Sequence, residues 1–215
     1  MATRRKVGNL MALAVLATVY QRPMHRYEMA SVIRAHGKDR DMDVKWGSLY
    51  TVVQNLERHH FVEAIGTSRQ GARPERTVYR ITDDGVAELV DWTRELLESP
   101  VQEHPRFAAG LSVFTVLPPE QVAELLRTRL ERLEASLAEQ REMLAKHVAT
   151  VPRLFLIEDE YMAAMTEAEV SWVRSLLDEI ASGTLPGLDG WRRFQESGEM
   201  PPELAELARR GVSTD

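Results

Sequence analysis

The chain lacks several features that would assign a function at once. Its 215 residues include no cysteine, which excludes a disulfide framework, a thiol nucleophile and a cysteine-ligated zinc finger. The sequence contains no nucleophile elbow, phosphate-binding glycine loop or zinc-binding helix motif. Its six histidines are not spaced as a metal site. We therefore expect no catalytic residue, no metal and no other cofactor, and we do not expect an enzyme.

Long hydrophobic runs are also absent. The apolar stretch over residues 10–20 follows Arg4, Arg5 and Lys6 and so imitates a signal peptide. It is too short to span a membrane, and residues 21–23 offer no small-residue cleavage site. We interpret residues 7–20 as a first helix rather than a leader. We expect a cytoplasmic protein without membrane contact, which the lack of cysteine also suits.

Positive charge is scarce overall but concentrated at one end. The net charge is −6, yet residues 1–82 hold 14 Lys and Arg against 7 Asp and Glu. The remaining 133 residues hold 13 against 26. This asymmetry predicts a basic N-terminal head domain that binds a polyanion, joined to an acidic C-terminal part with a different function. Arg4, Arg5 and Lys6 would extend the head as a flexible arm.

The most informative segment is an amphipathic helix that begins near residue 47. Its two faces differ: one is apolar (Leu49, Val52, Val53, Leu56), and the other is polar and centred on Thr51, Gln54 and Arg58, with Tyr50 and Asn55 beside it. Ser48 stands where an N-cap is expected. Taken alone, such a helix is typical of any protein surface.

A hairpin follows this helix and changes that interpretation. Residues 61–65 and 77–81 are rich in β-branched and aromatic residues, and they flank a Gly/Pro-containing connection that carries Arg69, Arg73 and Arg76. Thr82 then caps a fourth helix that reaches about residue 98. With a second helix over about 25–36, residues 1–99 are predicted to form a winged helix-turn-helix with a two-stranded wing.

Residues 100–215 are predicted to form a second, α-helical domain, so the whole fold is mainly α. A helix over about 120–149 carries a coiled-coil-like dimerisation seam (Leu126, Leu130, Leu133, Leu137, Leu144). A second long helix over about 154–180 carries one apolar stripe (Ile157, Tyr161, Met165, Ala168, Trp172, Leu176, Ile180). The two most simply form an antiparallel pair. Shorter helices are expected over about 107–114 and 203–210, with residues 183–190 as a loop.

The predicted DNA-binding residues divide into two groups. Gln54 and Asn55 can pair with adenine and Arg58 with guanine, with Thr51 beside them on the groove-facing side. Phosphate oxygens suit the others (Ser48, Tyr50, Arg69, Arg73, Arg76), because positive charge gains affinity by releasing counterions. Each residue alone is almost as well explained by solvation, so the set carries the prediction.

Tryptophans suggest a possible ligand pocket in addition. Trp92, Trp172 and Trp191 would suit a planar ligand, with Trp92 and Trp172 as the preferred effector-pocket candidates. Aromatic residues at helical spacing more often belong to a core or a dimer interface, and Trp172 is also a candidate dimerisation residue.

The N-terminal part resembles the PadR family of bacterial transcriptional regulators. The resemblance spans about residues 10–97 and rests on five pieces in order: residues 24–29 (MHRYEM), 47–50 (GSLY), 55–57 (NLE), 71–82 (GARPERTVYRIT) and 84–85 (DG). Two positions depart from the family pattern. Arg26 stands where the family usually has glycine, and Val78 replaces one of two aromatic residues after the wing.

The resemblance implies a homodimer that binds a roughly palindromic operator, usually as a repressor. By this likeness Tyr50 corresponds to a phosphate-contacting tyrosine and Arg73 to a wing contact. The C-terminal helices resemble a domain that dimerises by exchanging helices with its partner. Some relatives release DNA when phenolic acids or hydrophobic drugs bind, which a population shift explains. Two alternatives stay open: a protein–protein adaptor that uses a winged helix, and a helical enzyme or small-molecule sensor that does not bind DNA.

Overall fold

The computed structural model describes residues 5–38, 42, 46–68, 76–198, 202, 205 and 206. The chain divides into two compact units, Met1–Glu103 and His104–Asp215, and each is described by itself. The division falls four residues after the expected end of the first domain at residue 99. That the first unit binds DNA and the second dimerises stays a prediction.

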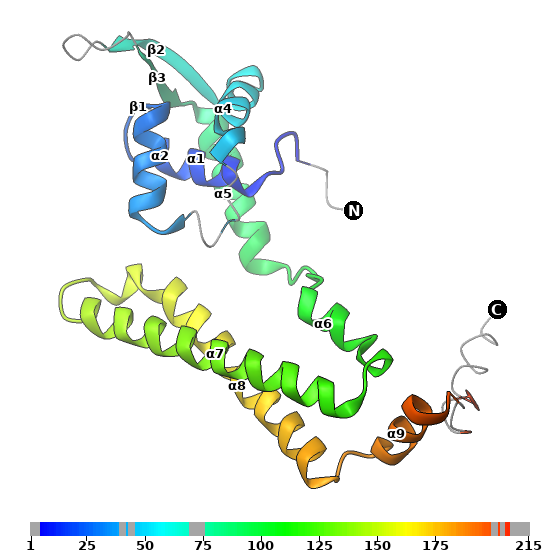
Figure 1. Cartoon of the computed structure of the whole chain (residues 1–215). Coiled ribbons are helices and arrows are strands. Elements are labelled where there is room, and N and C mark those ends of the chain that lie inside the picture. The colour runs from blue at the N-terminus through cyan, green and yellow to red at the C-terminus, as the bar shows by residue number, and fades with distance from the viewer. Residues whose placement is uncertain are drawn as a thin grey trace. The chain divides into compact units, whose positions relative to one another are not determined.

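Among the described residues, the helices of the first unit pack around an apolar core, and Figure 1 shows how these helices are arranged. They are α1 (Leu10–Gln21), α2 (Arg26–Ala35), α4 (Leu49–Arg58) and α5 (Asp83–Glu98). The signal-like apolar stretch is the central helix α1, in which every residue from Met11 to Leu16 is buried. The Asn9 Oδ1 atom caps it by accepting from the Met11 amide at 2.8 Å. Among the described helices, none is long and apolar enough to cross a membrane.

A small antiparallel sheet completes the first unit. Its order is β1-β3-β2, with β1 at Met24–His25, β2 at Val62–Ser68 and β3 at Arg76–Ile81. The predicted hairpin is confirmed, but the sheet has three strands where two were expected. Two residues are too short to give a periodic signal, so β1 could not be recognised from the sequence. It pairs Met24 with Tyr79 and thereby joins the start of α2 to the wing.

The predicted start of the fourth helix is confirmed in detail. Thr82 caps α5 by accepting from the Gly85 amide at 3.0 Å. The same hydroxyl donates to the carbonyl oxygen of His60 at 2.6 Å. His60 has φ of 60°, in the left-handed region, which turns the chain sharply between α4 and β2. One threonine therefore ties α5 to that turn.

The second unit contains two long helices, as predicted. They are α7 (Pro119–His147) and α8 (Ile157–Ser182), and they run antiparallel (Figure 1). Shorter elements flank them: α6 (Arg106–Leu111), η2 (Phe114–Val116), η3 (Arg153–Phe155) and α9 (Leu188–Ser197). The region expected as loop over 183–190 therefore ends inside a helix, since α9 begins at Leu188. The last predicted helix, 203–210, falls mostly outside the described residues.

The contact between α7 and α8 uses a different face of α8 from the one predicted. The side chains that pack toward α7 are small or branched (Ala163, Val170, Val173, Leu177, Ile180). Most of the predicted stripe is exposed instead, including Ile157, Tyr161, Met165 and Trp172. Helix α8 carries two apolar faces, and its smaller residues allow the closer approach. The predicted stripe was thus wrong as the intrachain contact, apart from its end at Leu176 and Ile180.

Candidate nucleic-acid interface

Helix α4 divides its residues between core and solvent as the sequence predicted. Leu49, Val52, Val53 and Leu56 are buried among α1, α2 and the sheet. On the other side Tyr50, Thr51, Gln54 and Arg58 are exposed, and Asn55 is half-buried. Thr51, Gln54 and Arg58 follow one another at helical spacings of three and four, so they form one polar row. This row is free to meet a ligand without disturbing the core.

The start of α4 differs from the prediction. A 3-10 turn, η1 (Trp46–Ser48), precedes the helix and continues into it. Ser48 therefore has helical dihedral angles, φ −96° and ψ −8°, and its side chain makes no capping hydrogen bond. Its hydroxyl instead lies 3.5 Å from the sulfur of Met11. The serine marks the helix start but anchors it to α1 rather than capping it.

An arginine–tyrosine stack lies at the same end of α4. The Cζ atom of Arg26, the first residue of α2, is 4.1 Å from the ring centre of Tyr50 and 5.5 Å from that of Tyr79. Tyr79 is buried in β3, and this burial raises the pKa of its phenol while the positive charge of Arg26 opposes the rise. The sequence showed only that Arg26 departs from a family glycine, and no pattern indicated its partners.

The described part of the wing carries one of the three predicted arginines. Arg76 begins β3 opposite Ser68, and its guanidinium lies 4.6 Å from the ring centre of Tyr27 on α2. The tyrosine itself is 70% exposed, so this stack between α2 and β3 is open to solvent. Arg69 and Arg73 lie outside the described residues.

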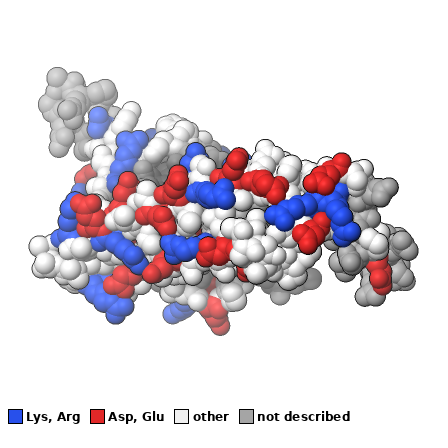
Figure 2. Space-filling model, turned by 60° about the horizontal axis from the view of Figure 1, so that its bottom comes forward, with Lys and Arg blue, Asp and Glu red and all other residues white. Residues whose placement is uncertain are grey.

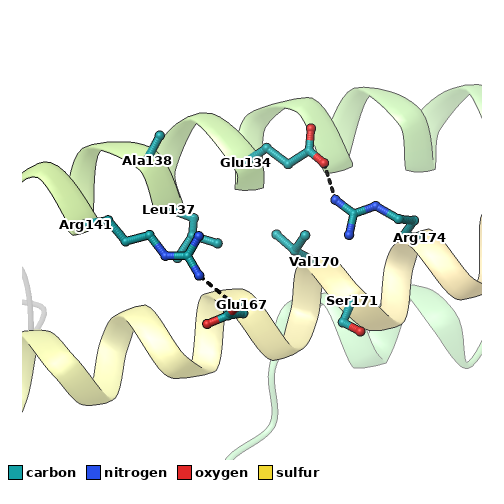
Figure 3. A pocket seen from close by; sticks show the side chains of 8 residues that line it. All are labelled: Glu134, Leu137, Ala138, Arg141, Glu167, Val170, Ser171 and Arg174. Carbon is teal, nitrogen blue, oxygen red and sulfur yellow. Dashed lines mark hydrogen bonds and ion pairs between the residues drawn. The ribbon is translucent and has the colours of Figure 1, made fainter.

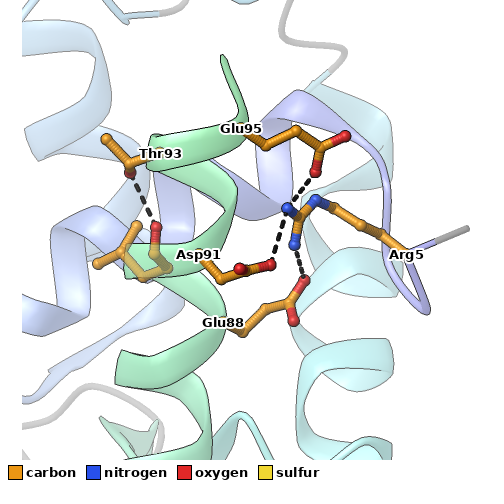
Figure 4. Close-up of polar contacts among 6 residues, drawn as sticks. Arg5, Glu88, Asp91, Thr93 and Glu95 are labelled. Carbon is orange, nitrogen blue, oxygen red and sulfur yellow. Dashed lines mark hydrogen bonds and ion pairs between the residues drawn. The ribbon is translucent and has the colours of Figure 1, made fainter. Parts of the chain in front are cut away.

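The prediction that Arg4, Arg5 and Lys6 form a flexible arm is wrong for Arg5. Arg5 is held on α5 by three carboxylates, with its Nη1 2.8 Å from Glu88 and its Nη2 3.1 Å from Asp91 and paired with Glu95 (Figure 4). Its Cζ atom is also 5.3 Å from the ring centre of Trp92. Burial opposes the charge of Arg5, but the three hydrogen bonds outweigh it and raise its pKa. Arg5 is therefore fixed, whereas Lys6 is exposed and Arg4 lies outside the described residues.

The predicted dimerisation seam is occupied within the chain. Leu126 is buried in one cluster with residues of α8 and α9, and Leu137 in another with Ala163 and Val170. Leu130, Leu133 and Leu144 are half-buried against these clusters. The four-three leucine spacing is thus explained by the antiparallel pair of helices, and a further role between subunits stays a prediction.

The N-terminal segment of the chain matches a known protein family. Residues 15–91 match the model of the Transcriptional regulator PadR-like family, and they include α2, α4 and both strands of the wing. Over this segment the chain is similar to the PadR-like family. The resemblance inferred from the five sequence pieces is confirmed, and so is the assignment to transcriptional regulators.

Related proteins extend the likeness beyond the winged helix. The negative transcriptional regulator PadR of Bacillus subtilis is 25% identical over 141 residues, which cover 62% of this chain and 77% of that protein. The solved structure of Bacillus subtilis PadR with operator DNA has a TM-score of 0.67 and 21% identity, covering 80% of this chain and 99% of that one. Its structure with p-coumaric acid has a TM-score of 0.66 and 19% identity, and again covers 80% of this chain and 99% of that one. This chain therefore shares its fold with both solved structures of that protein.

The tryptophans of this PadR-like chain lie in different surroundings. Trp92 is buried in the core of the first unit. Trp172 is 48% exposed on α8, with its ring edge-on to Phe107 at 6.1 Å between centroids. Trp191 belongs to the core of the second unit, where its indole N–H donates to the carbonyl oxygens of Thr115 and Leu117. A pocket shared by Trp92 and Trp172 stays a prediction.

A cavity of about 370 Å³ opens between α7 and α8 of this regulator (Figure 3). Ion pairs cross its walls, joining Glu134 to Arg174 and, at 2.7 Å, Arg141 to Glu167. Half of its lining residues are therefore charged, and none of them is aromatic. Acidic and basic side chains also interleave across the face of the molecule in Figure 2. The cavity does not resemble the aromatic pocket that the sequence suggested.

Proposed function

We propose that this PadR-like regulator binds operator DNA in the cytoplasm as a homodimer and represses transcription by occupying its site. The single observation that carries the proposal is the exposed polar row of α4 in a chain similar to this family. The Bacillus relative is named a negative regulator, and its solved complex contains operator DNA. A twofold dimer suits a palindromic operator because its two heads meet matching half-sites one helical turn apart.

The proposed contacts follow from the exposure of each residue. Gln54, Asn55 and Arg58 read base edges, with Thr51 alongside. The phosphate contacts come from Tyr50, from the helix start at Ser48 and from the wing (Arg69, Arg73, Arg76). Since the hydroxyl of Ser48 faces Met11, its contribution comes from its place at the helix N-terminus.

The homodimer forms, in this proposal, through the second unit. Large apolar side chains that are about half exposed or more follow one face of α8 and the preceding turn (Leu154, Phe155, Ile157, Tyr161, Met165, Trp172). We call this surface the α8 stripe. A set of exposed apolar side chains on one helix face is typical of a protein interface. The α8 stripe replaces the leucine seam as the main proposed contact, with Trp172 kept from the original set.

A small aromatic or hydrophobic ligand would release the DNA. The Bacillus relative has been solved with p-coumaric acid, which supports a ligand of this class here. A ligand that binds better to a dimer with a different spacing of its heads lowers operator affinity by that difference in binding free energy. Selection of bound DNA with and without cell extract would reveal such a ligand.

The decisive experiment selects genomic DNA fragments with the full-length protein and then measures affinity over a series of salt concentrations. Affinity for the selected site should fall steeply as salt rises. Gln54→Ala and Arg58→Ala should each lose about 1–3 kcal/mol of discrimination between the site and random DNA. Arg94→Ala, which removes an exposed positive charge from α5, is the control and should keep that discrimination.

Two results would overturn the proposal. If no fragment is enriched at low salt while a protein partner is captured, the chain is an adaptor. If a small molecule binds but no duplex does, it is a sensor without DNA binding.

A further inference from the structure

Arg26 occupies an unusual position for a surface arginine. Its guanidinium lies against two aromatic rings, with Tyr50 at 4.1 Å and Tyr79 at 5.5 Å from Cζ to ring centre. Its Nη1 atom is buried and has no hydrogen-bond partner among the described residues. A buried donor without a partner costs free energy, so the stacking contacts must compensate for it. Within the described part of the chain, the two rings hold this side chain and no carboxylate pairs with it.

The two rings belong to different parts of the proposed interface. Tyr79 is 3% exposed and sits in β3, the central strand of the sheet. Tyr50 is 57% exposed and lies in the first turn of α4. Arg26 therefore connects a fixed ring in the wing to a ring that is open to solvent. This contact restrains the exposed ring of Tyr50.

We propose that Arg26 is a positioning residue for DNA binding. It holds the ring of Tyr50 by a cation–π contact, so that the phenol hydroxyl is already oriented toward a backbone phosphate when the duplex arrives. This inference rests on the proposed DNA-binding function. The benefit is preorganisation, because a side chain that is already ordered loses less entropy on binding.

The alternative is that Arg26 itself contacts the phosphate. Its buried Nη1 and its place against the Tyr50 ring argue against that role. The two roles differ in salt dependence. Removing a direct phosphate contact lowers the slope of log affinity against log salt by about 1. Removing a positioning contact weakens binding but leaves that slope unchanged.

The test is a double-mutant cycle on the selected operator, with Arg26→Met and Tyr50→Phe. Arg26→Met should weaken binding by about threefold to tenfold, in line with a partly exposed cation–π contact, with an unchanged salt slope. In the Tyr50→Phe background, which has no hydroxyl to orient, Arg26→Met should have little further effect. Arg26→Lys keeps the charge but not the planar group, and it should give an intermediate loss. If Arg26→Met does not fold, the operator affinity and the salt slope are measured on Arg26→Lys instead.

A matched control lies on the same helix. Arg34 of α2 also stacks on an aromatic ring, with its Cζ 4.1 Å from the ring centre of Trp46. Arg34→Met removes one charge and one stack, but its effect should add independently to that of Tyr50→Phe. If Arg26→Met instead lowers the salt slope by about 1 and keeps its effect in Tyr50→Phe, Arg26 is a direct contact and the proposal is overturned.

A measurement without DNA separates this inference from the proposed function. In protein with ¹³C-labelled tyrosine, the ring signals of Tyr50 should shift in Arg26→Met and remain unchanged in Arg34→Met. If the wild-type protein binds no duplex at all, the proposed function fails even when this shift is seen. If the wild type binds operator but neither the ring signals nor the affinity responds to Arg26→Met, only the inference about Arg26 fails.

Discussion

A methyl group on Gly85 would lie 2.0 Å from the carbonyl oxygen of Phe61. Gly85 stands in the first turn of α5, where it is buried. The amide of Thr82 donates to the same Phe61 oxygen at 3.1 Å. The first turn of α5 therefore packs directly against the backbone of Phe61, which follows α4. Only glycine fits at position 85, because any side chain would overlap that backbone.

Replacing Gly85 by alanine should destabilise the first unit. At an open helical position alanine is favoured over glycine by up to about 1 kcal/mol. Here the backbone must move, and we expect a net loss of about 1–3 kcal/mol in the free energy of unfolding. Urea-induced unfolding measures it. Gly110→Ala in α6 is the control, since nothing lies within 4 Å of its added methyl group; it should be neutral or stabilising. Equal effects of the two variants would contradict this account.

Arg5→Met should destabilise the first unit by about 1–2 kcal/mol, between the values for surface and buried ion pairs. The change leaves Glu88, Asp91 and Glu95 as neighbouring like charges on α5 and removes the contact of Arg5 with Trp92. Thermal unfolding at low and high salt measures the loss, which should shrink as salt screens the carboxylates.

The matched control for Arg5 removes one of its acceptors. Asp91 is the most exposed of the three, with 73% of its side chain accessible, so Asp91→Asn should change stability much less than Arg5→Met. Adding Glu88→Gln to Arg5→Met should recover part of the loss. A wild-type stability for Arg5→Met would show that the three ion pairs contribute nothing measurable.

The N-terminal unit could largely be predicted from sequence because its signals are local. The spacing of Leu49, Val52, Val53 and Leu56 determines which face of α4 is buried, so it also determines which face stays exposed. The cap at Thr82 likewise depends on residues within one turn. These predictions required no knowledge of distant parts of the chain.

Contacts between distant residues could not be predicted in this way. The pairing of Arg5 with Glu88 joins residues 83 positions apart, and a basic residue near the N-terminus fits a solvated arm equally well. On α8, both the face containing Met165 and the face containing Val173 are apolar. Periodicity cannot decide which one packs against α7. Arg26 is similar, since its partners come from α4 and β3.

The stability of the first unit should fall at alkaline pH because of Tyr79. Burial raises the pKa of this phenol above its unfolded value, which is about 10. A raised pKa in the folded state favours the neutral phenol, so its contribution is complete below about pH 10 and is lost as pH rises through the folded-state pKa. Unfolding measured from pH 8 to 12 should show a steeper loss in wild type than in Tyr79→Phe. Tyr20→Phe, at a 61% exposed ring, should follow the wild type.

The α8 stripe should determine the oligomeric state. Met165 is 52% exposed in the middle of this stripe, and Met165→Glu would place a charge inside the proposed subunit interface, at a cost of several kcal/mol. Sedimentation equilibrium should show a dimer for wild type and at least about 100-fold weaker association for this variant. Ser171→Glu adds the same charge to α8 beside Arg174, on the side that lines the cavity (Figure 3), and should remain dimeric.

Because two linked heads bind a palindromic site far more tightly than one, Met165→Glu should also lose operator affinity while each head folds normally. A variant that stays dimeric and binds as wild type would place the subunit contact on another surface.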